Sequence, residues 1–429
     1  MKLTLTLILL SISSALWAQG TQAIGTASAT LDVTNIKPSV LTGGDMFSEL
    51  QTPTPVDMIE INPKFEVPKG SGKHTIGAGA LWLAGKDASG QVYTSSQTYR
   101  QNASPVNQPQ AGYWPGPIGN SQTLSHNAVY DKIWKISKIQ IQNHIVNYNT
   151  SGYVIPPDIA SWPGNGNIAN GEAAQLAPYP DINNDGVYSP NLGDYPIIKG
   201  DQALYLILND KGNVKEPASP TMNMEIHAMF YGFNDPANPA VYNTLFSQYR
   251  IINRGLINFK DFYAGIWVDF DLGNWNDDYI GCDTTTNRFF VYNSDNFDQD
   301  SFTVGNSGQS PYFFANGYGA NPPVQSVTFL DHKMSHFMFY LLDNHPVNGI
   351  PRVPSDFYNY LRGHWKNNMP ITTGGIGYNP LTPSAPASEY MFPGNPDTQA
   401  GWSEVTAGNN LSDRRGIGSI GPYNLPAGQ

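Results

Sequence analysis

The stretch with the clearest chemical spacing lies near the middle of the chain. Side-chain oxygens recur at alternate positions, Asp181, Asn183 and Asp185, and Gly186 follows directly. In calcium loops this spacing points alternate side chains at one cation, the glycine allows a sharp turn, and the carbonyl of the next residue, here Val187, supplies another oxygen. We therefore predict a Ca²⁺ site. A metal-free turn is the alternative, because Asp-Gly and Asn-Asp pairs also favour turns.

The far end of this loop indicates what kind of calcium site it forms. A helix–loop–helix calcium loop carries a bidentate glutamate at its twelfth position, whereas Leu192 stands there in this chain. Asp194, two residues later, can complete the ligand set only along a different loop path. We therefore predict a structural Ca²⁺ loop embedded in β structure and not a calcium sensor.

A second acidic stretch begins at the end of a predicted strand, residues 259–269, and continues into the turn beyond it. Carboxylates this dense repel one another unless a cation or water separates them, so we predict a second Ca²⁺ site; a solvated acidic loop is the alternative. Two of these carboxylates could instead hydrolyse a glycosidic bond if they lay roughly 5–9.5 Å apart across a sugar cleft. The candidate ligands are Asp269, Asp271, Asp277, Asp278 and Asp283.

Sequence motifs of common enzymes are missing. The chain contains neither a Gly-x-Ser-x-Gly elbow nor a His-Glu-x-x-His helix, so we assign no catalytic residue. Tryptophans in loop contexts could stack against sugars, although such residues more often cap a sandwich core. These tryptophans are Trp114, Trp162, Trp275, Trp365 and Trp402.

The composition is typical of an exported acidic protein. Residues 1–18 have the charged start, apolar centre and small-residue cut site of a signal peptide, and no later apolar run approaches the roughly 20 residues that span a bilayer. The net charge of −11 argues against nucleic acid, which needs a basic face. Cys282 is the only cysteine, so no intramolecular disulfide can form. We predict a secreted or outer-surface protein that calcium stabilises instead.

Short apolar runs predict a mainly β fold, built as antiparallel β-sandwich domains with long loops and few short helices. The runs contain β-branched and aromatic residues and are separated by Gly, Asp and Ser turns. The predicted strands are 26–33, 64–68, 75–84, 91–99, 202–209, 222–233, 244–253, 259–269, 324–330 and 336–342, and a short helix is predicted at 355–362.

Residues 129–146 fit two structures. Ile133, Ile136 and Ile139 have helical spacing, whereas residues 139, 141 and 145 alternate with polar residues as in a half-buried strand. We favour a strand for 139–146 and leave 132–138 open between strand and helix.

Composition shifts divide the chain into a series of regions. The predicted regions are the signal peptide 1–18, an N-terminal β-rich domain 19–165, a calcium-loop connector 166–201, a β-sandwich domain with the acidic stretch 202–345, and a Pro/Gly-rich β region 346–429.

Further motifs occur in order along the chain, beside the two acidic stretches. They are residues 65–68 (FEVP), 81–85 (LWLAG), 99–101 (YRQ), 113–117 (YWPGP), 193–196 (GDYP), 374–378 (GGIGY), 392–396 (FPGNP), 413–415 (DRR) and 421–428 (GPYNLPAG). With them, the whole mature chain resembles large exported Bacteroidota proteins carried over the outer membrane by the type IX secretion system.

This resemblance implies a surface or released protein with calcium bound at Asp181, Asn183, Asp185 and Asp194, and it implies no particular activity. Such proteins continue past the Gly-Pro-Tyr segment into more β structure and a C-terminal sorting domain. We therefore expect the natural chain to extend beyond Gln429.

Three functional hypotheses follow from the sequence. The leading one is a non-enzymatic, calcium-stabilised surface protein that binds or adheres to a glycan or another cell-surface component. The second is a secreted polysaccharide hydrolase that uses carboxylates of the acidic stretch. The third is a structural spacer within a longer surface protein.

Overall fold

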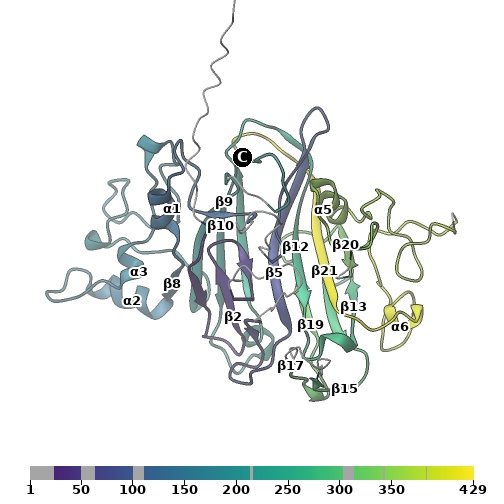
Figure 1. Ribbon diagram of the computed structural model, residues 1–429. Helices are drawn as coiled ribbons and strands as arrows, with labels where there is room; N and C mark the ends of the chain where they lie inside the picture. Colours follow the sequence, from purple (N-terminus) through teal and green to yellow (C-terminus); the bar gives the residue numbers. More distant parts are fainter. Residues whose placement is uncertain are drawn as a thin grey trace, which may run out of the picture.

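The computed structural model describes residues 24–49, 63–99, 111–212, 216–302, 314–341, 344–382 and 384–429. Over these residues the fold is mainly β, with antiparallel sheets and few short helices, which confirms the predicted class (Figure 1). The predicted signal peptide lies outside the described residues. In the described part of the chain, every helix is too short or too polar to cross a bilayer.

The largest sheet has nine strands and joins distant parts of the chain. Its order is β1 (Ser28–Thr30), β2 (Lys37–Leu41), β3 (Asp45–Met46), β5 (Ile76–Lys86), β12 (Phe259–Phe270), β21 (Arg414–Leu425) and β20 (His336–Tyr340), with β4 (Phe65–Glu66) beside β2 and β6 (Val92–Ser95) beside β5. The central neighbours β5, β12 and β21 come from three of the predicted regions. These regions therefore share one sheet and one core.

A second sheet of five strands packs against the first. Its order is β11 (Phe246–Asn253), β10 (Met224–Gly232), β9 (Gln202–Asn209) and β7 (Trp114–Pro115), with β8 (Trp134–Ser137) also on β9. Side chains alternate across a strand, and β9 is apolar on both faces. Leu204, Leu206 and Leu208 enter the core shared with the nine-stranded sheet, whereas Tyr205 and Ile207 enter a separate core.

That separate core is covered by a helical layer, at the left of Figure 1. The layer comprises α1 (Leu124–Tyr130), α2 (Lys138–Asn147), α3 (Pro157–Ala160) and the 3-10 turns η1 (Ile168–Asn170) and η2 (Pro190–Leu192). Two predicted sugar platforms, Trp114 and Trp162, are buried in the structure, as is Trp365 elsewhere. Their indole rings are core residues and offer no surface for a sugar.

The strand that we favoured for residues 139–146 is wrong, because this segment is helix α2. Ser137 caps the helix: its side chain accepts the N–H of Gln140, and the Gln140 side chain accepts the N–H of Ser137. This capping box stabilises the start of a helix. Its effect on the structure of residues 139–146 is larger than that of the alternating isoleucines, which favour a strand. Ile141 is buried, while Ile139 is 76% exposed.

The other end of the nine-stranded sheet carries a three-stranded sheet and two helices. These are β13 (Asp278–Asp283), β14 (Arg288–Asn293), β19 (Gln325–Thr328), α5 (Pro354–Leu361) and α6 (Glu404–Ala407). Strand β21 lies between the three-stranded sheet and α5, whereas α6 packs against β13. Gly418 faces the three-stranded sheet, where an added Cβ would lie 2.6 Å from the Phe289 ring, and on the opposite face the Ser419 hydroxyl donates to the Leu361 carbonyl of α5.

The remaining elements are short. They are α4 (Pro239–Tyr242), η3 (Trp275–Asp277), and the two-stranded pairs β15 (Phe297–Asp298) with β18 (Gly319–Ala320) and β16 (Ser301–Phe302) with β17 (Phe314–Ala315). The helix predicted at 355–362 is confirmed as α5.

Candidate metal centres

The loop of residues 181–194 lies in the helical layer and folds back on its first carboxylate. Asp181 accepts the backbone N–H of Asp185 at 3.2 Å and that of Gly186 at 2.8 Å. Asn184 and Gly186 take the left-handed φ angles of 59° and 77° that this winding requires. The loop thus has a sharp turn around its first acidic residue, as both the calcium site and the metal-free turn predict.

The other two side-chain oxygens lie on the outside of the same turn. Asn183 donates from Nδ2 to Asp185 Oδ2 at 2.7 Å, and Asp185 Oδ1 accepts the Val187 N–H at 2.8 Å. Asn183, Asp185 and Val187 are exposed. No lysine, arginine or histidine of the described segments forms an ion pair with Asp181 or Asp185. Their negative charges are therefore open to a cation from solution.

Asp194 closes the base of the 181–194 loop. It is fully buried, and its Oδ1 accepts the Ile182 N–H at 2.8 Å while its Oδ2 accepts the Ser189 N–H at 2.7 Å. Each of these two oxygens has a second lone pair that could bind a cation. The assignment of Asp194 as a calcium ligand therefore stays a prediction. The hydroxyl of Tyr188 anchors the loop to α3 by donating to the Ile159 carbonyl at 2.7 Å.

The second acidic stretch contributes to a cluster of Asp269, Asp271 and Asp413 with Arg415. We call it the buried acidic cluster after the buried Asp269 and Arg415, although Asp271 and Asp413 are half-buried. One carboxylate oxygen from each aspartate lies within 4.8 Å of the other two. Asp269 is the penultimate residue of β12, and antiparallel pairing places it opposite Arg415 on β21. The sequence analysis grouped Asp269 with Asp271 but missed Asp413. The signal available was the 413–415 motif, which places a carboxylate beside two arginines.

Arg415 neutralises part of this cluster. Its Nη2 lies 3.1 Å from Asp269 Oδ1 and 2.9 Å from Asp413 Oδ2, and its Nε donates to the Tyr99 hydroxyl at 2.5 Å. Tyr99 in turn donates to Asp269 Oδ2 at 2.7 Å. Arg415 is 1% exposed. The chain therefore supplies its own cation at this point.

Burial dominates the electrostatics of the cluster. It raises the pKa of Asp269 to about 7, with a further rise from Asp413 and opposing effects of Arg415 and Tyr99. Burial and the neighbouring Asp269 and Asp413 carboxylates raise the pKa of Asp271 well above its ordinary value. Calcium–oxygen distances of about 2.3–2.6 Å fit this carboxylate spacing, so the triad could hold a metal ion, in competition with Arg415.

The adjacent arginine forms a second buried ion pair on the opposite face of β21. Arg414 donates from Nε and Nη2 to the two carboxylate oxygens of Glu404 on α6, at 2.9 and 2.8 Å. Both side chains are buried. Such bidentate pairs fix geometry as well as charge, so β21 is tied to the layers on both of its faces.

The other predicted ligands of the acidic stretch lie elsewhere. Asp277 and Asp278 are buried near Asp298, and burial together with the Asp298 charge raises the pKa of Asp277 to about 6. Asp283 stands at the far end of β13 in a turn, where hydrogen bonds from Thr285 and Thr286 lower its pKa to about 2. Among the described residues, only the aspartates of the buried acidic cluster have the mutual spacing of three metal-binding side chains.

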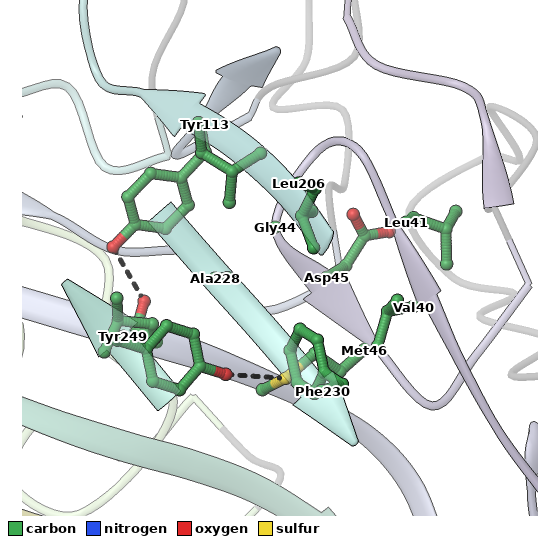
Figure 2. Close-up of a pocket in the computed structure, with 12 residues that line it drawn as sticks. Val40, Leu41, Gly44, Asp45, Met46, Tyr113, Leu206, Ala228, Phe230 and Tyr249 are labelled. Carbon is green, nitrogen blue, oxygen red and sulfur yellow. Dashed lines mark hydrogen bonds between the residues drawn. The ribbon is translucent and has the colours of Figure 1, made fainter. Parts of the chain in front are cut away.

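Two hollows lined by described residues are candidates for a ligand site. One lies between the two large sheets, beside Met46, Tyr113 and Tyr249, and its volume is about 10 Å³ (Figure 2). That is too small for a ligand and at the limit for one water. The Tyr249 hydroxyl donates to Met46 Sδ at 3.2 Å across it.

The second, which we call the polar hollow, is open to solvent between α1 and η1 and measures about 590 Å³. At its base the buried Glu172 carboxylate lies 2.9 Å from His126 Nε2 and accepts hydrogen bonds from Asn170, Tyr130 and the Asn167 N–H. The lining residues are Ser121, Thr123, Ser125, His126, Val129, Tyr130, Asn167, Ala169, Asn170 and Glu172.

Comparison of the chain with protein-family models, curated proteins and solved structures finds no match.

Proposed function

We propose that this chain is an exported, calcium-stabilised β-sandwich protein with a non-enzymatic binding role. The observation that carries the proposal is the form of the 181–194 loop, in which the backbone winds around Asp181 and leaves the Asn183 and Asp185 oxygens exposed. A hard cation such as Ca²⁺ prefers carboxylate, amide and carbonyl oxygens. The loop offers all three without an internal positive charge.

Calcium bound here would stabilise the whole helical layer. The loop is attached to α3 through Tyr188 and to α2 through the Asp194 carbonyl, which lies 3.1 Å from His144 Nε2. Ordering a loop costs roughly 1–2 kcal/mol per residue in backbone entropy. A ligand that binds only the folded loop offsets part of that cost, and the chain has no second cysteine with which to form a disulfide.

The hydrolase hypothesis has weaker support. A glycosidase needs two carboxylates on either side of a sugar chain, but Asp269 and Asp278 are both fully buried. Their raised pKa values follow first from this burial. We therefore do not assign either residue a catalytic role.

The polar hollow supports the proposal that the partner is a glycan or a similar hydroxylated molecule. Its wall is rich in hydroxyl and amide groups, and Val129 at its rim is 67% exposed. Sugars combine hydroxyls with apolar C–H faces, and pockets recognise them with a few oriented polar groups beside apolar surface. Cell-surface export, which rests on the sequence of residues 1–18 and on the type IX resemblance, would place such a partner within reach.

The calcium proposal is tested by thermal unfolding of the mature chain in EDTA, then with added Ca²⁺. At about a hundredfold excess over the dissociation constant we expect a gain of about 2.7 kcal/mol. A double variant, Asp181→Asn with Asp185→Asn, should lose that gain.

The matched control for this experiment is Asp87→Asn. Asp87 is another carboxylate in a turn, where it accepts the N–H groups of Ser89 and Gln91 at 2.8 and 3.0 Å. This variant should keep the full calcium response. A wild-type chain that melts at the same temperature with and without Ca²⁺ would refute the proposal.

The glycan part of the proposal needs its own test. Affinity electrophoresis in gels that contain neutral polysaccharides should retard the wild-type chain. The variant Ser125→Trp, which fills the polar hollow from the exposed face of α1, should migrate without retardation. Ser89→Trp, in an exposed turn elsewhere, is the control and should be retarded like the wild type.

A further inference from the structure

One short segment joins the 181–194 loop to the polar hollow. Residues 163–177 follow α3 and run back along themselves: the Ala177 N–H donates to the Pro163 carbonyl at 3.0 Å, and Asn165 forms an antiparallel bridge with Gln175. We call this segment the connecting hairpin. Its tip carries η1, which forms one wall of the polar hollow, and its base is hydrogen-bonded to the 181–194 loop.

The side chain of Asn165 makes the contact at the base. Its Oδ1 accepts the Tyr188 N–H at 2.6 Å, and its Nδ2 donates to the Gly186 carbonyl at 3.1 Å and to the Ala174 carbonyl at 2.9 Å. The Tyr179 hydroxyl donates to the same Oδ1 at 3.4 Å. A carboxamide has two donor and two acceptor positions, and all four are used here. One side chain therefore ties two backbone groups of the loop to the opposite side of the hairpin.

The two loop residues that Asn165 holds lie on either side of a predicted calcium ligand. Gly186 and Tyr188 flank Val187, whose carbonyl the calcium spacing assigns to the cation, and Gly186 directly follows Asp185. Each residue has only two soft backbone dihedrals, so neighbouring groups in a tight turn cannot move independently. A cation that fixes Asp185 and Val187 therefore also fixes the backbone groups to which Asn165 is bonded.

Close packing at the base supports this connection. Gly164 approaches the loop so closely that an added Cβ would lie 2.6 Å from Tyr188 Cβ. At Gly166, an added Cβ would lie 2.3 Å from the Ala173 carbonyl oxygen and 2.9 Å from Glu172 Cβ. Packed interiors transmit displacements because they contain little free space. A shift of the loop backbone should therefore move the base of the connecting hairpin.

The tip of the hairpin positions the carboxylate at the base of the polar hollow. The Asn167 N–H donates to Glu172 Oε2 at 2.8 Å, and the Glu172 N–H donates back to the Asn167 carbonyl at 3.2 Å. Asn170 Nδ2 donates to Glu172 Oε1 at 3.0 Å. His126 Nε2, on α1, lies 2.9 Å from the same oxygen. The two walls of the hollow thus meet at Glu172, whose position depends on the hairpin that carries it.

We propose that calcium in the 181–194 loop controls ligand binding in the polar hollow, through Asn165 and the connecting hairpin. The inference rests on the proposed function, which supplies both the calcium and the ligand. Without calcium, Gly186 and Tyr188 lose their fixed positions, and the η1 wall loosens with them. With calcium, the wall is already ordered, so a ligand loses less conformational entropy of the protein when it binds. Such coupling is reciprocal, and a ligand in the hollow tightens calcium binding by the same factor.

Hydrogen exchange of the mature chain, in EDTA and in saturating Ca²⁺, tests the coupling with no ligand in the hollow. The amides of Asp185 and Gly186, which are bonded to Asp181, report on the loop. The amides of Asn167 and Glu172 report on the hollow. These amides exchange through local opening, and we expect Ca²⁺ to slow exchange at both places at least about tenfold.

The variant Asn165→Ala distinguishes this route from a general stabilisation by calcium. It removes the bonds to Gly186 and Tyr188 but none of the predicted calcium ligands. The loop amides should still slow on addition of Ca²⁺, whereas the amides of Asn167 and Glu172 should change less than about twofold.

The matched control is Asn379→Ala. Asn379 is another amide that spans a turn, where its Nδ2 donates to the Thr372 hydroxyl and to the Gly374 carbonyl, both at 3.0 Å. This variant should keep the calcium response of the loop and that of the hollow.

The outcomes separate this inference from the proposed function. Loop amides that ignore Ca²⁺ would refute the calcium proposal itself. A wild-type chain in which the loop responds, but the amides of Asn167 and Glu172 do not, would overturn the control of the hollow while calcium binding stands. A full response of the hollow in Asn165→Ala would overturn the route through this side chain.

Ligand binding itself is measured by retardation in gels that contain dextran, a neutral polysaccharide. The affinity of the wild type should be at least about fivefold lower in EDTA than in Ca²⁺, and Asn165→Ala should show the lower affinity in both. Equal affinity of the wild type in the two conditions would overturn the control by calcium. A wild type that is retarded in neither would refute the glycan part of the proposed function, even where the exchange responses stand.

Discussion

The 181–194 loop and the buried acidic cluster both gather aspartates, but they balance that charge in opposite ways. In the cluster, Arg415 lies 3.1 Å from Asp269 and 2.9 Å from Asp413, and the guanidinium is almost fully buried. In the loop, the carboxylates of Asp181 and Asp185 are hydrogen-bonded to backbone N–H groups and face solvent. A buried charge must be paired within the fold, whereas an exposed one can take its cation from solution.

This difference assigns different roles to regions that look alike in sequence. The cluster has metal-ligand spacing, but its cation is part of the chain and its role is to join β12 to β21. In the 181–194 loop, no cationic side chain of the described residues pairs with Asp181 or Asp185, and our proposal gives this loop a cation from solution. Experiments that change one charge at a time can separate the two roles.

Removal of the internal cation should have the largest effect. Arg415→Met leaves the carboxylates of the cluster buried without their partner, and breaking a buried pair from one side costs about 3–5 kcal/mol. Urea unfolding measures the loss. Arg352→Met, at an exposed arginine, should cost less than about 0.5 kcal/mol. If both variants unfold at the same urea concentration, the cluster does not depend on Arg415.

The base of the 181–194 loop comes next. Asp194→Asn replaces one of the two carboxylate oxygens with an NH₂ group, which cannot accept the backbone N–H that it faces. A buried donor left without an acceptor lowers the free energy of unfolding by about 1–3 kcal/mol. Thermal unfolding in EDTA should show this loss, and calorimetric titration should show weaker Ca²⁺ binding. Asn191→Asp, on the exposed η2 turn, serves as the control. Wild-type stability in Asp194→Asn would contradict a closing role for this carboxylate.

The third prediction concerns pH. Because the folded-state pKa of Asp271 lies well above its ordinary 3.8, the unfolded chain ionises first as pH rises. This carboxyl therefore costs no stability below about pH 4 and lowers stability progressively above it. Asp271→Asn should remove that slope and stabilise the chain at pH 8 by about 1.4 kcal/mol for each unit of pKa shift removed.

Denaturant unfolding across pH 4–8 tests this prediction. The wild type should lose stability relative to Asp271→Asn as pH rises, and the two should converge at pH 4. A variant that is less stable than the wild type at pH 8, and that has lost a response to Ca²⁺, would show that the cluster holds a metal in spite of Arg415.

The smallest effect is expected at Asp283. Its carboxylate accepts hydrogen bonds from the Thr285 N–H at 2.9 Å and the Thr285 hydroxyl at 2.6 Å in an exposed turn. Asp283→Asn should change the stability by less than about 0.5 kcal/mol and leave the calcium response of the melting temperature unchanged. A lost calcium response would restore Asp283 as a ligand, as the sequence analysis predicted.

Local patterns in the sequence predicted the positions of several strands. The alternation in residues 259–269 and the apolar run 202–209 became β12 and β9 with bounds close to those predicted. Helix α2 was missed because alternation was weighed above the Ser137–Gln140 capping box, which was also visible in the sequence. Here the helix cap at Ser137 decided between the helical spacing and the strand alternation of the isoleucines.

The candidate sites were harder to predict, because their members meet through long-range pairing. Asp181, Asn183 and Asp185 lie within one turn, so their spacing was enough to place them together. Asp413 joins Asp269 only because β21 pairs with β12 in one register, with Arg415 opposite Asp269. No local pattern contains that register, and the burial of Trp114 and Trp162 likewise depends on layers formed by distant segments.

The arginines at 414 and 415 also bear on how the chain reaches its native state. Arg415 meets Asp269 across 146 positions of sequence, and β12 lies between β5 and β21 in the sheet. Contacts this distant give a high contact order, and high contact order slows folding. The central sheet can close only after β21 has been synthesised, because β21 pairs with β12 along its length. Until then β12 has an unpaired edge on that side.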